Sequence, residues 1–358
     1  MTLSPVFRSQ DAVRLLADHG VWSRLAGDIK AQAEAVQVLY KDLEGILGPD
    51  FRSEPSHTPS DSEATTTKGL HFLQEYFFLI LFRSIFQSVG VDGDRLQLYT
   101  ELNFCIKGTI TAADNIFDDQ AKTLLPLAEN SGSRFISILQ LIAFERLLRK
   151  VLDRGEAQGI VRAEQRNAIQ LGLLDRMAAI GMLEGSEEGG VQEIPAPDEM
   201  LESVHRVRGG ALFALAFVAP SILEGDEVSR ALHAAEIAVA QLGTAFQIVD
   251  DLTDFEFDVT RRSHNLLVSQ VHHVGSDEER ARLRQYWEGE TIEETVVGSL
   301  FRESAQAVLE RAYSEAQASF VGLADLGFWF NPQLSDQVVQ AIVGLDGVAR
   351  IEDLVVVK

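Results

Sequence analysis

The sequence has little cysteine and little positive charge. Its 358 residues include one cysteine, Cys105, so no disulfide can form within the chain and a reducing compartment is expected. Lys and Arg number 31 against 54 Asp and Glu, which gives a formal net charge of −23. Nucleic acids and anionic membrane surfaces attract basic proteins. The charge therefore argues against both partners, and we expect a cytoplasmic protein.

Long hydrophobic runs are also missing. The most apolar stretch, Tyr76 to Phe82, is bounded by Glu75 and Arg83 and is far shorter than the about 20 residues that span a bilayer. The first residues lack the basic start and apolar run of a signal peptide. We expect no transmembrane segment, and the Tyr76 to Phe82 stretch predicts a buried core helix.

Strand patterns are scarce, and helical periodicity fills most of the chain. Only the end of the chain, residues 351–357, predicts a short strand or, equally, an extension along the surface. With 46% hydrophobic residues, the sequence predicts an all-α fold, a single large helical bundle around one core. We expect four segments: an N-terminal helical segment at 1–47, a flexible loop rich in Ser, Thr and Pro at 48–67, a helical domain at 68–326, and a C-terminal extension packed on it at 327–358.

Acidic residues gather near the end of a helix predicted over residues 227–257. Asp250, Asp254 and Asp258 are four residues apart and share one helix face, with Asp251 beside them. Like charges at this spacing repel by a few tenths of a kcal/mol per pair. A solvated acidic face is one interpretation, and a magnesium site is the other, because Mg²⁺ binds through one or two carboxylates together with substrate phosphates.

The surroundings of this acidic cluster favour the metal site. The preceding residues, 238–249, have the apolar composition of a buried helix, and no Lys or Arg occurs between Ala231 and Thr260 to balance the charge. A buried helix that ends in unbalanced acids is typical of the mouth of a helical cavity. The cluster therefore predicts a site for magnesium and a diphosphate.

A second acidic cluster lies upstream. Asp114 and Asp118 are again four residues apart, with Asp119 adjacent, and they end an apolar stretch at 104–117 that only Lys107 interrupts. Negative side chains at a helix C-terminus oppose the helix dipole, so both clusters need compensation from cations. In a helical bundle we expect the two clusters to face each other across the mouth of a cavity.

These two clusters resemble the aspartate-rich motifs of the class I isoprenoid synthases, specifically the trans-prenyl diphosphate synthase (polyprenyl synthetase) branch. The matching stretches are DNIFDD at 114–119 and FQIVDDLTD at 246–254, and the resemblance runs from about Lys68 to Leu326. Many members have aspartate where this chain has Asn115. The resemblance implies the isoprenoid synthase fold with a central apolar cavity, three Mg²⁺ ions assembled with substrate diphosphate, ionisation of an allylic prenyl diphosphate, and a homodimer.

The resemblance also implies roles for individual residues. Asp114, Asp118, Asp250 and Asp254 are expected to be catalytic metal ligands, with Asp119, Asp251 and Asp258 supporting the metal ions. Segment 204–213 is similar to the family segment in which Lys-Thr precedes a kinked apolar helix, so Arg208 would take the place of the lysine beside the diphosphate. The further diphosphate contacts would be Arg261, Arg262, Lys122, Lys68 and Gln247.

The basic segments that family members use for isopentenyl diphosphate are depleted. Elongating members carry Gly-Gly-Lys-Arg in an early helix and paired arginines after the first acidic motif, whereas this chain keeps Lys68 and Lys122 there. We therefore favour a terpene synthase on a prenyltransferase scaffold, which cyclises or eliminates one substrate. The alternative is a polyprenyl diphosphate synthase that condenses an allylic diphosphate with isopentenyl diphosphate. A non-catalytic partner subunit, or an acidic helical protein without activity, fits less well because both acidic motifs are present.

Two further expectations concern residues near the motifs. Small residues one and two turns before the first motif, Gly108 and Thr109, predict a deep cavity and a substrate of roughly twenty carbons or longer. Asn265, Ser269 and His273 have the spacing of a terpene synthase Asn-Ser-Glu metal triad. Its last member is wrong, so we interpret the spacing as coincidence.

Overall fold

The computed structural model describes residues 18, 20–55, 58–60, 63–64, 66–117, 121–128, 132–292 and 296–329. Within these residues the regular structure is helical, and the only β-type pairing is an isolated antiparallel bridge between Arg52 and Leu127. The predicted all-α class is confirmed. The expected strand or surface extension at 351–357 lies outside the described residues.

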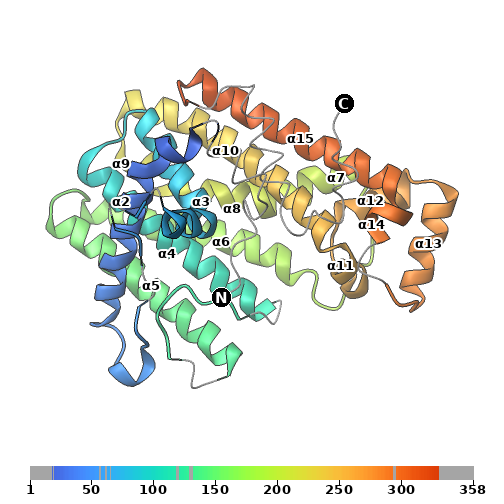
Figure 1. The fold of residues 1–358 in the computed structure, drawn as a ribbon, viewed down its shortest axis with the longest axis horizontal. Helices are drawn as coiled ribbons and strands as arrows, with labels where there is room; N and C mark the ends of the chain where they lie inside the picture. Colours follow the sequence, from blue (N-terminus) through green and yellow to red (C-terminus); the bar gives the residue numbers. More distant parts are fainter. Residues whose placement is uncertain are drawn as a thin grey trace. The chain divides into compact units, whose positions relative to one another are not determined.

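Residues 20–171 and 216–232 form the first compact unit. Helix α4 packs along α5, and α2 contacts α3, α4 and α5 (Figure 1). Its core holds fully buried aromatic rings, among them Phe77, Tyr99, Phe104 and Phe144. The helices are α2 (Val21–Leu43), η1 (Pro49–Phe51), α3 (Thr67–Ser88), α4 (Gly93–Phe117), α5 (Ser133–Ala157) and α9 (Val218–Leu223).

The apolar stretch Tyr76 to Phe82 is part of α3 and is largely buried, as predicted. Helix α3 is kinked at Tyr76, whose φ of −115° and ψ of 19° are non-helical. The Glu75 carbonyl beside the kink accepts a hydrogen bond from Nζ of Lys107 on α4, and that Nζ lies 4.7 Å from the centroid of the Tyr76 ring. The Glu75 carbonyl and the Tyr76 ring at the kink therefore position the Lys107 ammonium group.

Residues 172–215 and 233–329 form the second compact unit. Helix α12 contacts α7, α13 and α15 in this unit (Figure 1). The chain passes between the units within α6 (Ala163–Gly185) and within α10 (Asp226–Thr253). The other elements are α7 (Pro197–Met200), η2 (Leu201–Gly210), α8 (Ala211–Ala214), η3 (Leu215–Phe217, partly in the first unit), α11 (Phe255–Arg261), α12 (Leu266–His273), α13 (Asp277–Trp287), α14 (Val296–Leu300) and α15 (Arg302–Asp325).

Two long helical stretches are not regular α-helices in the structure. Residues 197–223 are helical throughout, but η2 is a ten-residue π-helix and η3 is a 3₁₀ turn. The helix predicted over 227–257 breaks at Asp254, where φ is −103°, and α11 begins at Phe255. Sequence periodicity does not distinguish these windings from an α-helix, because they shift each hydrogen bond by only one residue.

Two helical stretches have the length and apolar composition of a membrane span, Pro197–Leu223 and Asp226–Thr253. In each, 56% of the most apolar window is buried inside the protein. Burial of this extent is typical of a core helix in a bundle, so we assign both stretches to the core.

Candidate active site

The acidic cluster of Asp250, Asp251 and Asp254 lies where the apolar part of α10 ends. Ile248, Val249 and Leu252 are buried, whereas Asp250 and Asp254 are exposed. The Asp254 backbone N–H donates to the Asp250 carbonyl at 2.9 Å, so the four-residue spacing persists up to the break. The end of α10 thus presents two carboxylates to solvent, while neighbouring apolar side chains of the same helix are buried.

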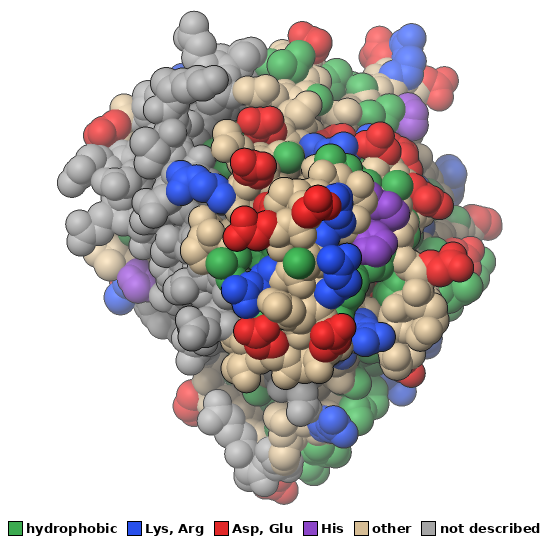
Figure 2. All heavy atoms as spheres, turned by 90° about the vertical axis from the view of Figure 1, so that its right-hand side faces the viewer, with side chains coloured by type: hydrophobic (Ala, Val, Ile, Leu, Met, Phe, Trp, Pro, Cys, Tyr) green, Lys and Arg blue, Asp and Glu red, His purple; other side chains and the backbone are tan. Residues whose placement is uncertain are grey.

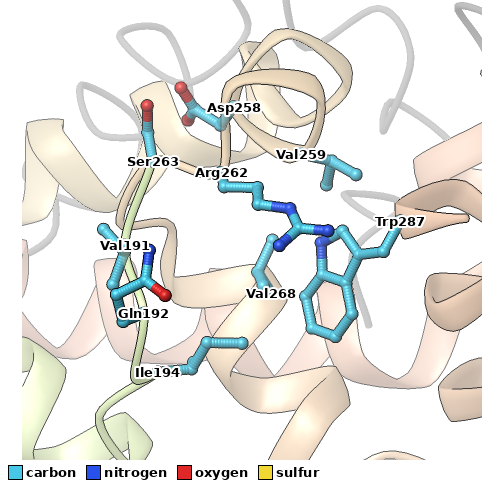
Figure 3. Close-up of a pocket in the computed structure, with 9 residues that line it drawn as sticks. All are labelled: Val191, Gln192, Ile194, Asp258, Val259, Arg262, Ser263, Val268 and Trp287. Atoms are coloured by element: carbon cyan, nitrogen blue, oxygen red, sulfur yellow. The ribbon is translucent and has the colours of Figure 1, made fainter. Parts of the chain in front are cut away.

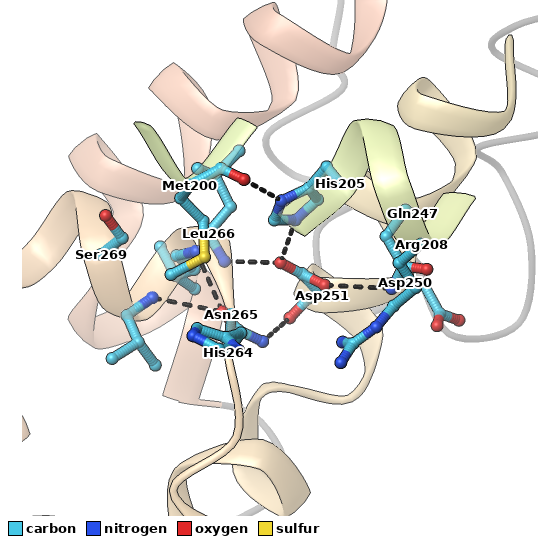
Figure 4. Close-up of polar contacts among 12 residues, drawn as sticks. Met200, His205, Arg208, Gln247, Asp250, Asp251, His264, Asn265, Leu266 and Ser269 are labelled. Atoms are coloured by element: carbon cyan, nitrogen blue, oxygen red, sulfur yellow. Dashed lines mark hydrogen bonds and ion pairs between the residues drawn. The ribbon is translucent and has the colours of Figure 1, made fainter. Parts of the chain in front are cut away.

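Asp251 points into the protein instead. Its side chain is 2% exposed, and Oδ2 lies 2.7 Å from Nε2 of His205 on η2 (Figure 4). The same oxygen accepts the backbone N–H of Leu266, and Gln247 Nε2 donates to the other oxygen at 3.4 Å. Figure 4 shows Asp250 directed away from the His205 ring. Asp251 therefore fixes three segments of the second unit to one another.

An oxygen atom faces each ring nitrogen of His205, an arrangement that favours the doubly protonated ring. Nδ1 lies 3.1 Å from the Met200 carbonyl, which can only accept, and Nε2 faces the Asp251 carboxylate. Burial alone would lower the pKa of His205, but the Asp251 charge and its hydrogen bond outweigh burial and raise it. The pair is a buried imidazolium–carboxylate contact.

Two glycines allow η2 to approach α10 this closely. A Cβ on Gly209 would lie 2.3 Å from the Gly243 carbonyl oxygen, and a Cβ on Gly243 would lie 2.3 Å from the Gly209 carbonyl oxygen. No larger residue fits at either position without separating the two helices. The contact sits one helical turn from both His205 and Gln247, so it sets the distance across which Asp251 reaches His205.

Asn265 connects Asp251 to Asp258. It caps α12 by accepting the backbone N–H groups of Leu267 and Val268, and its Nδ2 donates to the Asp251 carbonyl at 2.7 Å and to Asp258 Oδ2 at 2.8 Å. Burial, followed by the charge of Asp251, raises the pKa of Asp258 well above its usual range. Asp258 is thus held by a partner inside the protein.

The residues with triad-like spacing hold backbone groups. Asn265 caps α12, Ser269 Oγ donates to the Pro195 carbonyl at 2.6 Å, and His273 Nε2 lies 2.9 Å from the Ile194 carbonyl. Each side chain has a structural partner, which accounts for the spacing without a metal triad.

Arg208 is paired with carboxylates that the sequence analysis missed. Its guanidinium lies 2.5 Å from Glu184 and 2.5 Å from Glu187, and Nδ1 of His264 lies 2.5 Å from Glu187 as well. Burial would raise the pKa of Glu187, but His264 and Arg208 outweigh it and lower it. The two glutamates fall in and before a Gly-rich turn, and nothing in that pattern marks them as partners of Arg208.

The two arginines after α11 have different surroundings. The Arg261 guanidinium carbon lies 4.9 Å from the centroid of the Phe257 ring, a cation–π contact on the surface. Arg262 lines a pocket with Trp287. Neither of these contacts bears on the expected roles in binding diphosphate, which remain predictions.

In the first unit, Asp114 is exposed near the end of α4, and Asn115 beside it is 2% exposed. The Asn115 amide donates to the Lys122 carbonyl at 2.7 Å and accepts the Lys122 backbone N–H at 3.1 Å. A carboxylate cannot donate to a carbonyl, so Asn rather than Asp suits this position. Asp118 and Asp119 lie outside the described residues.

The expected cations of the first unit are exposed, and the Phe144 ring lies against Gly108. Lys122 and Lys68 are exposed, and Lys68 lies 2.6 Å from Glu63. A Cβ on Gly108 would lie 2.1 Å from the Phe144 ring. The idea that Gly108 leaves room for a long substrate is therefore wrong, because Phe144 occupies that space.

The exposed carboxylates suit magnesium bound together with a phosphate. Among the residues that the structure describes, no three His, Cys, Asp or Glu side chains converge to hold an ion by themselves. Mg²⁺ does not need such a cage, since it is usually bound by one or two carboxylates, substrate phosphates and water. Asp114, Asp250 and Asp254 offer the hard oxygen ligands that this mode requires.

Comparison with known proteins gives matches at the level of structure. The sequence matches no protein-family model and no curated protein. A decaprenyl diphosphate synthase from Rhodobacter capsulatus matches with a TM-score of 0.60 and 19% identity, over 90% of this chain and 98% of the other. A geranylgeranyl pyrophosphate synthetase from Pyrococcus horikoshii matches with a TM-score of 0.59 and 15% identity, over 90% and 98%.

A third match is the polyprenyl synthase from Caulobacter crescentus, whose structure contains calcium and isoprenyl diphosphate. Its TM-score is 0.53 and its identity 17%, over 91% of this chain and 98% of the other. All three structures are matched over 98% of their length. The protein has the fold of the polyprenyl diphosphate synthases, the all-α isoprenoid synthase fold.

Proposed function

We propose that the protein is a magnesium-dependent class I isoprenoid synthase that ionises an allylic prenyl diphosphate and transfers the prenyl group to isopentenyl diphosphate. The observation that supports it most is the pair of exposed carboxylates, Asp250 and Asp254, at the end of a buried helix in a chain with the polyprenyl synthase fold. The matched synthases are named for prenyl chain formation, which favours prenyl transfer over the terpene synthase reaction that the sequence favoured.

The chain's own residues have separable roles in this proposal. Asp114, Asp250 and Asp254, with Asp118 and Asp119, would hold the magnesium ions. When bound, the ions supply positive charge that stabilises the departing diphosphate. Asp251 and Asp258 would support this cluster from inside the protein. Asp251 bonds to His205 and Asp258 bonds to Asn265, and these contacts hold the end of α10 and the start of α12 in place.

Cationic and polar side chains would complete the diphosphate site. Lys68, Lys122 and Arg261 are exposed, and Gln247 lies one turn before Asp251. Arg208 would release its ion pairs with Glu184 and Glu187 and bind the diphosphate instead. An allylic cation also needs surroundings without water. The aromatic and aliphatic core residues of each unit are suited to exclude water.

A terpene synthase reaction is the second candidate, supported by the weak cationic character of the first unit. Lys68 is paired with Glu63 at 2.6 Å. Burial, followed by the nearby charge of Lys122, lowers the pKa of Lys107 to about 8 although Glu75 opposes the shift. A second diphosphate would find few free cations there.

Product analysis separates the two candidates. Purified protein is incubated with allylic diphosphates of increasing chain length and magnesium, with and without isopentenyl diphosphate, and products are identified by mass. We expect a longer prenyl diphosphate that forms only with isopentenyl diphosphate. A hydrocarbon or alcohol that forms without it would select the terpene synthase, and no diphosphate release from any substrate would refute both.

A further inference from the structure

A small pocket of about 130 Å³ lies in the second unit, and neither Asp250 nor Asp254 lines it. Its walls are the segment before α7, the end of α11, Val268 of α12 and Trp287 of α13 (Figure 3). Val259, Val268 and Ile194 make much of the lining apolar, and Gln192 and Ser263 add polar groups. Of the residues considered for the candidate active site, Asp258 and Arg262 line this pocket.

The backbone holds Arg262 at this pocket in an unusual conformation. Arg262 follows the last residue of α11 with φ 58° and ψ 43°, the left-handed region in which glycine is the usual residue at a helix end. The backbone N–H of Val191 donates to the Arg262 carbonyl at 2.8 Å. Gly190, with φ 89°, leaves room for the arginine, since a Cβ there would lie 3.1 Å from the Arg262 Cβ.

The Arg262 guanidinium is a cation without an acidic partner. It makes no ion pair with any residue that the structure describes, and Figure 3 shows it extended between Val259 and Val268 toward Trp287. The Asp258 carboxylate, also at the pocket, bonds to Asn265 and points to the other side in Figure 3. A strained arginine that lacks a carboxylate partner is suited to an external anion.

Two histidines lie beside Trp287, the residue of α13 that lines the pocket. The His272 ring lies 6.0 Å from Trp287 and 4.7 Å from His273, measured between ring centroids. Burial, followed by the charges of His273, Arg280 and Arg284, lowers the pKa of His272. Figure 2 shows Lys, Arg and His side chains together in the middle of the face that carries these helices, with acids around them.

Two acids at the ends of α13 are paired with arginines other than Arg262. Asp277 lies 2.6 Å from Arg280, and Glu290, just after the helix, lies 3.2 Å from Arg282. Among the residues that line the pocket, Asp258 is the one acid, and its carboxylate bonds to Asn265.

The size and lining of the pocket limit the ligand. A cavity of about 150 Å³ holds a benzene molecule, so this pocket of about 130 Å³ has room for a ligand body of about that size. The planar guanidinium matches a carboxylate in two parallel hydrogen bonds. We propose that the pocket binds a small organic carboxylate, with its carboxylate on Arg262 and its apolar body against Val268, Ile194 and Trp287.

Calorimetric titration of the full-length protein with benzoate, benzamide and inorganic phosphate tests this proposal. Benzoate is expected to bind saturably, whereas benzamide, which has the same shape without the charge, and phosphate, which lacks the apolar body, bind at least tenfold more weakly. Phosphate binding as tight as that of benzoate would overturn the assignment to an organic ligand. Absence of saturable benzoate binding would overturn the site itself.

Two substitutions locate the ligand. R262G removes the guanidinium but suits the left-handed backbone, so the variant is expected to melt no lower than the wild type and to lose benzoate affinity at least tenfold. R262M is expected to lose it to the same extent. R282M is the matched control, because it removes one arginine charge from the same face without touching the pocket, and it should bind benzoate as the wild type does. Equal affinity of R262G and wild type would refute the proposal.

Discussion

At the scale of the residue, adjacent aspartates of the second motif have opposite surroundings. Asp250 is exposed, whereas Asp251 is buried against His205 and the α12 backbone. A buried charge that loses its partner costs far more than a surface charge. A substitution at Asp251 is therefore expected to change the stability of the protein, and a substitution at Asp250 to change its proposed chemistry.

Replacement of Asp251 by alanine should destabilise the protein by about 3–5 kcal/mol, because it leaves the His205 imidazolium buried without its partner. Asp250→Ala, the same change one residue earlier, should alter the free energy of unfolding by about 0.5 kcal/mol or less. Urea denaturation followed by circular dichroism measures both. Equal destabilisation by the two variants would contradict the inward role of Asp251.

Lys107 should make stability depend on pH. Its pKa is about 8 in the fold against 10.5 for an ordinary lysine, so the unfolded chain binds the proton more tightly. This group therefore makes the protein more stable as pH rises from about 8 toward 10.5, by roughly 3 kcal/mol at about 1.4 kcal/mol per pKa unit. Lys107→Met should lack that rise when the free energy of unfolding is measured across this window. Parallel pH profiles of variant and wild type would show that burial does not disfavour the charge.

At the scale of the element, the pairing of η2 with α10 organises the candidate site. The π-helix carries His205 and Arg208, α10 carries Gln247 to Asp251, and Gly209 and Gly243 set their separation. π-Helical turns are rare and are often found at functional sites. We expect this contact to tolerate no added methyl group.

Gly209→Ala should destabilise the protein by about 1–3 kcal/mol or more, because its Cβ would lie 2.3 Å from a backbone oxygen that cannot move alone. Gly181→Ala in α6 is the control, since no atom lies within 4 Å of its added Cβ. Helix propensity predicts a gain of up to about 1 kcal/mol for the control. Thermal unfolding distinguishes the two, and a stable Gly209→Ala variant would refute the close contact.

The elements also show where sequence patterns stop being informative. The start of helix α13 (Asp277–Trp287) is marked in the sequence by a Ser276–Glu279 capping box. Helix α12 has only eight residues, too few for a helical period to stand out. The break at Asp254 and the π-helix depend on tertiary contacts, which no local pattern records.

At the scale of the whole molecule, the all-α class and the isoprenoid synthase fold follow from the sequence. Two short acidic motifs indicated a fold shared with synthases that are only 15–19% identical. The motif pattern indicated a supporting role for Asp251 at the metal ions but not its inward direction toward His205. The glutamate partners of Arg208 and the Phe144 ring against Gly108 come from long-range packing. The central cavity, the homodimer and the cytoplasmic location remain predictions.

The central claim is that exposed carboxylates on both motifs bind magnesium for diphosphate release. The most direct test measures inorganic diphosphate released from an allylic prenyl diphosphate in the presence of isopentenyl diphosphate by wild type, Asp114→Asn and Asp250→Asn, with magnesium and after its removal by chelation. We expect release by the wild type only with magnesium, and at least about a hundredfold less from either folded variant. Release that persists without a divalent ion, or in both variants, would contradict the account.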